Sequence, residues 1–397
     1  MKIKILISLG ILSFLALSAG GCVGGQQKLV GFSGVMSYDG ILYLGSMDGK
    51  MMAADPLARS QQLPFPSPDG EWSFAITMPS KSWSCSSSSK PDSIYGTPVA
   101  VDGSVCIGTY SGKVLMLNPS ARSQNLPFPH MRGGEWIYPR TDDIIGAIVG
   151  SPVAVNDTIY VCSSDGRVYA LDKTYGDEKW KSKPLGDKLW ITPVAKGEVI
   201  YVSTFDGYIY TLSAKNGDLL PWVFAAETGF VSSPVLYEDT VFVGSFDSKL
   251  YAIRIGDDKP LWEFLGGNWF WAAPVVNDSI VYAGCLDGKV YALDAERGKE
   301  SWEFDAGGRI VSSPILVGDS LVVATEPGNV FVINPKTGSG ERIKNPDDSQ
   351  NAKSLIDARI QSSLCALDSI VYIRAQDNCL YAVDVAKREI KLEFPLA

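Results

Sequence analysis

The chain alternates short apolar runs with polar turns. In one clear stretch a run begins at Pro274, a second covers residues 280–284, a third covers residues 289–293, and a fourth ends in Trp302. The turn between the second and third runs is Asp287-Gly288. Apolar runs of this length separated by Asp-Gly turns are typical of β-hairpins. No segment has a sustained helical period, so we expect an all-β protein made of four-stranded antiparallel meanders.

This unit of about forty residues recurs from end to end of the chain, the mark of a repeat architecture. Two degenerate copies begin near Gly34 and at Leu364, and six copies share a proline at the start of the first strand: Pro98, Pro152, Pro193, Pro234, Pro274 and Pro314. One sheet cannot bury both of its faces, so the copies must stack and close on one another. We therefore expect a single domain over residues 30–397, an eight-bladed β-propeller of four-stranded antiparallel blades.

The ends of the repeat array bear on how the ring closes. The array starts with a first-strand pattern and ends at Leu392-Glu393-Phe394 with a fourth-strand pattern. This phase allows each blade to form from one continuous unit. A latch of Gln27 to Val30 against the last blade is the alternative.

A tryptophan recurs near the start of the fourth strand. It is replaced by Ile343 and Leu392 in the last two units and is present in the others as Trp72, Trp136, Trp180, Trp222, Trp262 and Trp302. A large aromatic residue at a fixed offset from a glycine turn indicates packing between adjacent sheets. Ligand stacking is the alternative reading of the same residues.

The first 21 residues have the features of a targeting segment. Lys2 and Lys4 precede an apolar run, which is too short to span a bilayer comfortably, and the run ends in small residues followed by Cys22. This order resembles a bacterial lipobox, so we expect residues 1–21 to be a lipoprotein signal peptide and Cys22 to be lipid-modified. Residues 22–29 then form a tether. An ordinary secretory signal with a chance cysteine is the alternative.

Charge and candidate chemistry exclude several functions. The net charge of -9 and the lack of a basic stripe disfavour nucleic acid as a partner. His130 is the single histidine and has no partner motif, which gives little support to a catalytic triad or a zinc site. The Asp-Gly turns lack the spaced oxygen ligands of a calcium loop. Aligned repeats keep the six cysteines after Cys22 apart, so we expect buried free thiols.

The repeat, with Ser-Ser-Pro-Val at its start and Gly-Lys-Glu-x-Trp-x-Phe at its end, closely resembles the PQQ-like β-propeller family over residues 30–396. Its quinoprotein members hold the quinone PQQ between a tryptophan and a disulfide of adjacent cysteines, beside a calcium ion. This chain has no Cys-Cys pair. We expect no cofactor, with PQQ and calcium as the alternative. Whether the chain is an enzyme stays open, and the sequence favours a binding protein.

Candidate binding residues come from the faces of the ring. Turns between second and third strands open on the same side as the connections between blades, which we name the inter-blade face. On it we predict a binding rim of Trp190, Phe230, Trp269, Trp271, Arg309 and Arg359, because aromatic and arginine side chains dominate binding hot spots. Filling of a tapered channel by large residues is the alternative. Twin insertions, residues 58–66 and 121–129, lie on the opposite face and are either functional loops or copies left by a blade duplication.

The family includes a lipoprotein branch that serves the outer-membrane barrel-assembly machinery, and this chain resembles that branch in size, lipobox and blade count. The resemblance implies a lipid-anchored, extracytoplasmic scaffold of the bacterial cell envelope. Its expected partners are envelope proteins or peptides, and it would contact the membrane only through its anchor. We expect a monomer. A PQQ-dependent oxidoreductase and a small-ligand or glycan receptor are the alternatives.

Overall fold

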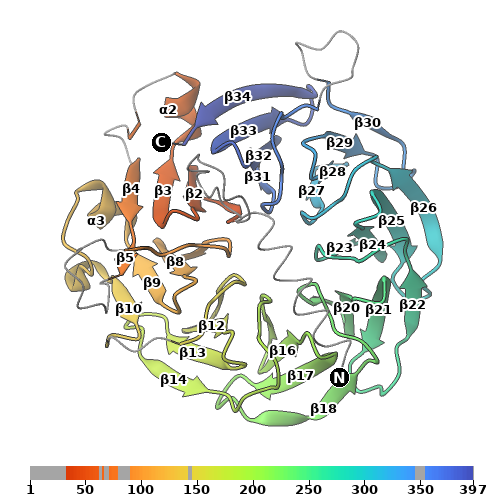
Figure 1. Ribbon diagram of the computed structural model, residues 1–397, viewed down its shortest axis with the longest axis horizontal. Coiled ribbons are helices and arrows are strands. Elements are labelled where there is room, and N and C mark those ends of the chain that lie inside the picture. The colour runs from red at the N-terminus through yellow and green to blue at the C-terminus, as the bar shows by residue number, and fades with distance from the viewer. Residues whose placement is uncertain are drawn as a thin grey trace, which may run out of the picture.

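The computed structural model describes residues 33–61, 65–66, 71–78, 90–141, 145–344 and 354–396. Eight four-stranded antiparallel sheets stand around a central axis, each made of four strands that follow one another in the sequence (Figure 1). The predicted eight-bladed propeller is therefore confirmed. Its blades are β1–β4, β7–β10, β11–β14, β15–β18, β19–β22, β23–β26, β27–β30 and β31–β34.

The strands of blades 1 to 4 are β1 Val35–Tyr38, β2 Ile41–Gly45, β3 Lys50–Ala54, β4 Trp72–Ala75, β7 Val99–Val101, β8 Ser104–Gly108, β9 Val114–Leu117, β10 Trp136–Tyr138, β11 Val153–Val155, β12 Thr158–Cys162, β13 Val168–Asp172, β14 Glu178–Lys181, β15 Val194–Lys196, β16 Val199–Ser203, β17 Tyr208–Ser213 and β18 Leu219–Ala225. Those of blades 5 to 8 are β19 Val235–Tyr237, β20 Thr240–Gly244, β21 Lys249–Arg254, β22 Trp262–Leu265, β23 Val275–Asn277, β24 Ile280–Gly284, β25 Lys289–Asp294, β26 Glu300–Asp305, β27 Ile315–Val317, β28 Ser320–Ala324, β29 Val330–Ile333, β30 Gly340–Arg342, β31 Cys365–Leu367, β32 Ile370–Arg374, β33 Cys379–Asp384 and β34 Glu389–Pro395. A small hairpin, β5 Thr77–Met78 and β6 Lys90–Pro91, follows blade 1.

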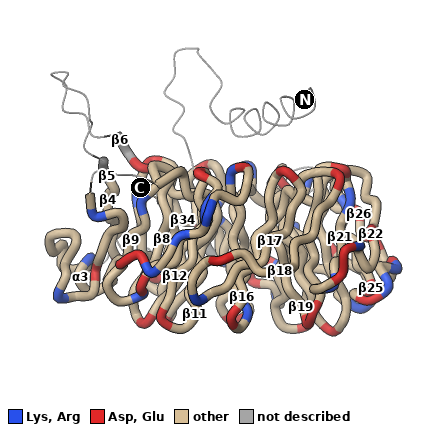
Figure 2. Tube along the Cα trace, turned by 90° about the horizontal axis from the view of Figure 1, so that it is seen from below, with Lys and Arg blue, Asp and Glu red and all other residues tan. Residues whose placement is uncertain are grey.

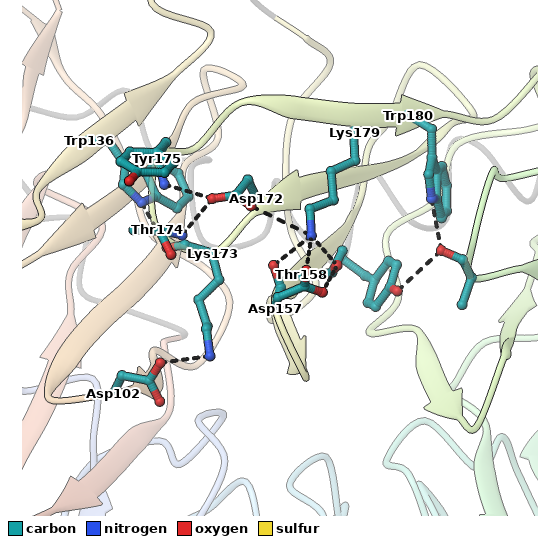
Figure 3. Close-up of polar contacts among 12 residues, drawn as sticks. Asp102, Trp136, Asp157, Thr158, Asp172, Lys173, Thr174, Tyr175, Lys179 and Trp180 are labelled. Atoms are coloured by element: carbon teal, nitrogen blue, oxygen red, sulfur yellow. Dashed lines mark hydrogen bonds and ion pairs between the residues drawn. The ribbon is translucent and has the colours of Figure 1, made fainter.

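The fold depends on packing between blades. The two middle strands of most blades are almost wholly buried, and the buried clusters join neighbouring blades. The recurring tryptophan acts at these joints as predicted. The indole Nε1 of Trp136 donates to the carbonyl of Lys173 in the next blade at 3.1 Å, and that of Trp180 donates to Ala214 at 2.9 Å (Figure 3). We call this contact the tryptophan lock.

A glycine completes four of the tryptophan locks. Gly298 has φ +65°, and a Cβ atom placed on it would lie 2.6 Å from the ring of Trp262 in the preceding blade. The same clash would arise between Gly176 and Trp136. Only a residue without a side chain can take a left-handed conformation and let the indole lie this close. The Gly turn and the tryptophan are therefore two halves of one contact, which explains why both recur in the sequence.

The joints between blades 8 and 1 and between blades 1 and 2 are built differently. Here the twin insertions replace the glycine turn, and each carries a short helix, α2 Pro56–Ser60 or α3 Pro119–Ser123. Asp55 and Asn118 cap these helices, and a proline occupies the first turn of each. The sequence analysis predicted no helix. It missed them because five residues are too few to show a period.

Each insertion holds a buried ion pair that clamps the preceding blade. Arg59 Nε donates to Glu71 Oε1 at 2.7 Å, and Arg122 Nε donates to Glu135 Oε1 at the same distance, with both pairs at most 3% exposed. The Arg59 guanidinium lies 4.6 Å from the ring of Phe394 in β34, so α2 lies beside the last strand of the ring (Figure 1). The equivalent ring for Arg122 is Phe74 in β4, at 4.7 Å. The twin insertions thus act as clamps in place of tryptophan locks.

Ring closure uses contacts between complete blades. All four strands of blade 8 come from the C-terminal unit and all four of blade 1 from the N-terminal unit, as the phase of the repeats allows. Arg374, which is 1% exposed, donates from Nη1 to the carbonyl of Gly45 across the joint. Burial lowers the pKa of Arg374 to about 10. Gln27 to Val30, the latch considered above, lie outside the described residues.

The two faces of the ring carry the segments that topology assigns to them. β5 and β6 lie on the inter-blade face, and α3 lies toward the opposite face (Figure 2). Within the described ranges, no helix has both the length and the apolar character needed to cross a bilayer. Five cysteines in these ranges are free, and burial raises the pKa of Cys106 and Cys162. Cys85 lies outside them.

Candidate protein-binding face and central cavity

The inter-blade face presents an arc of four aromatic rings. Trp190 lies edge-on to Phe205 with 5.9 Å between ring centroids, and Phe205 contacts Phe246 at the same distance. Phe246 contacts Trp269 at 5.0 Å. All four side chains are half-buried. We call this series, which runs across blades 4 and 5 to the start of blade 6, the aromatic arc.

The aromatic arc contains two residues that the sequence analysis missed. Phe205 and Phe246 occupy the second position of the turns Thr204-Phe205-Asp206-Gly207 and Ser245-Phe246-Asp247-Ser248. These turns connect the second and third strands of blades 4 and 5. The signal was available, because most turns at this position carry a smaller or polar residue such as Ser164. The Asp that follows each phenylalanine predicts a turn and says nothing about the aromatic residue before it.

Phe230 belongs to the core and not to the rim. Its side chain is 0% exposed and packs edge-on against Tyr251, with ring centroids 5.8 Å apart. Phe270 is buried in the same way one blade further on. Both stand four residues before the proline that starts the first strand, a position that holds a buried Ile or Leu in other blades, such as Ile310. This position, in the connection that leads into the first strand, therefore packs into the interface between sheets.

The arginines of the predicted rim lie in a polar sector at blades 7 and 8. Arg309 and Arg359 are exposed, and Arg359 Nη1 is 3.9 Å from Glu326 Oε1. Gln361 donates to the same Glu326 oxygen at 2.8 Å and accepts from Gln376 at 2.5 Å. The mouth of the ring thus has an aromatic side and a hydrogen-bonded polar side. The sequence analysis had treated them as one rim.

Trp190 and Trp271 also line a central cavity of about 440 Å³ at the inter-blade end of the channel. Its wall is formed mainly by residues one and three positions before the first-strand prolines, such as Thr192 and Trp190 before Pro193. Trp269 is outside this lining. Of the predicted aromatic rim residues, Trp190 therefore borders both the arc and the cavity, Trp271 borders the cavity, and Trp269 belongs to the arc alone.

The repeated Asp turns on this face are stabilised within each blade. Asp247 Oδ1 accepts the backbone N–H of Lys249 at 3.2 Å, and Asp247 Oδ2 accepts the hydroxyl of Tyr251 at 2.6 Å. Asp165, Asp287 and Asp377 make the same pair of contacts. Burial, together with the hydrogen bond to Asp247, raises the pKa of Tyr251. These carboxylates serve turn structure, and the described residues contain no group of three His, Cys, Asp or Glu side chains placed to hold a metal.

The cavity does not fit the PQQ and calcium pair of quinoproteins. PQQ carries three carboxylates, and calcium prefers several carboxylate or carbonyl oxygens. The described residues that line the cavity include no Asp, Glu, Lys, Arg or His. A trianion and a divalent cation would both lack the charged partners that buried charges require. The chain also lacks adjacent cysteines.

Comparison with known proteins agrees with this architecture. The crystal structure of BamB from Moraxella catarrhalis superposes with a TM-score of 0.62 at 16% identity, over 88% of this chain and 92% of that one. The computationally designed Ika8 protein superposes with a TM-score of 0.65 at 13% identity, over 94% of this chain and 98% of the designed one. At these identities the likeness shows the fold. No curated protein matches the chain.

The sequence profile of one family covers nearly all of the repeat region. It matches residues 40–182, 133–229 and 221–393, overlapping segments that together extend over all eight blades. The chain therefore belongs to the family described as "Outer membrane protein assembly factor BamB".

Proposed function

We propose that this protein is a lipid-anchored scaffold of the bacterial cell envelope that binds protein partners during outer-membrane protein assembly. The observation that carries the proposal is the aromatic arc, a continuous series of half-buried rings on one face of the ring. Membership of a family named for outer-membrane protein assembly supports this proposal.

The aromatic arc suits protein binding for physical reasons. Each ring contacts its neighbour, so little side-chain entropy remains to be lost when a partner binds. Aromatic residues supply large contact areas and are enriched among the residues that dominate interface energies. Lys188 lies 5.3 Å from the ring of Trp190 and adds a charged group at the end of the arc. An extended peptide or strand from a partner could cover several of these rings at once.

The proposed anchor would hold this face near a membrane. The chain from Cys22 to Ser33 has eleven residue steps, which span at most about 40 Å when fully extended. Ser33 precedes β1, whose start lies on the inter-blade side, and its hydroxyl donates to the carbonyl of Gly96 at 3.0 Å. A partner reached by the arc would therefore be one presented close to the membrane surface.

Removing the arc should abolish the scaffold function while leaving the fold intact. We expect the variant Phe246→Ala with Trp269→Ala to fail to restore outer-membrane β-barrel protein levels in cells that lack the native gene, because two rings of the binding surface are gone. The matched control is Leu57→Ala with Met131→Ala, which removes side chains that are 65% and 60% exposed and that lie in α2 and in the short 3-10 helix Met131–Gly133, next to the twin insertions. Full complementation by the arc variant, with circular dichroism like wild type, would refute the proposed surface.

The anchor is tested separately. Cys22→Ser should abolish incorporation of radiolabelled palmitate and release the protein from washed membranes, because the thiol that carries the lipid is absent. Cys379→Ser, which changes a partly exposed cysteine of the ring, should leave both unchanged. If Cys22→Ser is labelled and sediments with membranes like the wild type, the lipid anchor is not at Cys22.

A further inference from the structure

The central cavity combines flat aromatic faces with unused hydrogen-bond donors. Trp190, Trp271, Tyr95 and Phe205 contribute rings to its wall. Serine and threonine are the commonest polar residues of its wall, and the described lining is free of charged side chains. Its volume of about 440 Å³ lies within the range of small-molecule sites.

Three of the hydroxyl groups are oriented by the backbone. The N–H of Thr97 donates to Ser151 Oγ, that of Ser151 donates to Thr192 Oγ1, and that of Thr192 donates to Ser233 Oγ, each at 2.9 Å. This chain of bonds passes from blade to blade around the channel. Each hydroxyl oxygen accepts one bond and keeps its own hydrogen, which can be donated to a ligand. The series stops at Ala273, which stands at the next equivalent position.

Trp190 supplies a second, independent sign of a missing partner. Its Nε1–H is buried and makes no hydrogen bond with the described residues. Leaving a buried donor unsatisfied costs about 1–3 kcal/mol, and Trp190 lines the cavity, so a small turn of its ring that brought this N–H to an acceptor on a ligand would be favoured. By contrast, the Nε1 groups of the five tryptophans in locks all donate to carbonyls of the next blade.

These groups select one class of ligand. A charged molecule would be buried without a counter-charge, and a purely apolar one would leave the hydroxyls and the indole N–H unsatisfied. A neutral sugar ring has apolar C–H faces that pack on indole rings and hydroxyls that accept and donate hydrogen bonds. We propose that the central cavity binds an uncharged pyranose sugar, either as a free mono- or disaccharide or as the terminal residue of a longer glycan. This site goes beyond the scaffold function and does not depend on it.

The test measures sugar binding by the purified protein. Glucose, galactose, N-acetylglucosamine, maltose and maltohexaose are titrated separately, with tryptophan fluorescence and saturation-transfer NMR as readouts. We expect saturable binding of at least one of these sugars. Similar affinities for maltose and maltohexaose would identify a terminal residue as the ligand, and preference for maltose would identify a free sugar.

Variants locate the bound sugar. Trp190→Phe keeps a ring and removes the N–H, and Trp271→Ala removes a ring, so each should weaken binding at least tenfold. The matched control is Tyr175→Ala, which removes an aromatic side chain that is 62% exposed and lies outside the cavity lining, and it should change affinity less than twofold. Absence of binding by the wild type to all five sugars would overturn the proposal, as would equal weakening by Tyr175→Ala.

Discussion

Replacing Glu71 with Ala should lower the free energy of unfolding by about 3–5 kcal/mol, because it leaves the guanidinium of Arg59 buried without its anion. The Arg59 side chain is 2% exposed, and the Glu71 carboxylate is 0% exposed. The same carboxylate accepts the backbone N–H of Asp55, the N-cap residue of α2, at 2.8 Å. The substitution therefore also removes the hydrogen bond that holds the start of this helix. Since this clamp joins blades 8 and 1, we expect the ring to open first at the joint between these two blades. Urea denaturation followed by circular dichroism measures the change.

Two controls separate the clamp from a general loss of charge. Glu263→Ala removes a carboxylate that is 36% exposed and paired with Lys249, and it should cost at most about 1 kcal/mol. Arg59→Met combined with Glu71→Leu removes both charges and should recover much of the stability lost in Glu71→Ala, because no buried charge is left alone. Equal stability of the Glu71→Ala and Glu263→Ala variants would show that the buried pair does not stabilise the joint between blades 8 and 1.

Replacing Trp262 with Ala should lower the free energy of unfolding by about 3–5 kcal/mol, as large-to-small changes in a core do. The side chain is 9% exposed, and its ring packs on Gly298 of the next blade and lies 5.7 Å from Phe242. Its Nε1 also donates to the carbonyl of Ala295 at 2.9 Å. The substitution therefore removes both packing and a hydrogen bond between blades 5 and 6. The shift in melting temperature measures the loss.

The hydrogen-bond part of the tryptophan lock can be isolated with phenylalanine. Trp262→Phe keeps most of the ring and loses the bond to Ala295, whereas Trp72→Phe loses none to the described residues, among which Trp72 Nε1 has no partner. We expect Trp262→Phe to be the more destabilising by about 1 kcal/mol, the net value of one such bond. An unchanged melting temperature for Trp262→Ala would contradict the packing role.

Clamps and tryptophan locks together explain why the twin insertions are near-copies. A lock needs a tryptophan in one blade and a glycine turn in the next, and the insertions remove the turn. Trp72 keeps its buried position with its Nε1 unpartnered, and Arg122 clamps Phe74 two residues further along the same strand. Conservation of packing at both joints is sufficient reason for the two insertions to share Arg, Phe and Glu.

Strand number, blade number and the tryptophan joints could be predicted from the sequence because they depend on local features that repeat. Alternation of apolar residues defines the strands, and Asp-Gly turns define their ends. The first-strand prolines fix the phase of each copy, and the strands after Pro193 and Pro274 begin at the next residue. The different positions of Phe230 and Trp190 could also be predicted. They stand four and three residues before their prolines, and the position four residues before the proline holds a large apolar residue, which is buried, in the other blades as well, such as Ile310.

The tertiary structure alone decided which side chains act together. Phe205 and Phe246 are about forty residues apart and meet only because their turns lie side by side on neighbouring blades. Arg59 contacts Phe394, which lies more than three hundred residues away in the sequence, and the buried Nε1–H of Trp190 is left without a partner among the described residues. Local sequence sets backbone conformation through sterics and turn chemistry. Contacts between blades depend on how the closed ring places side chains that are far apart in the sequence. The periodic pattern alone does not predict which of these side chains meet.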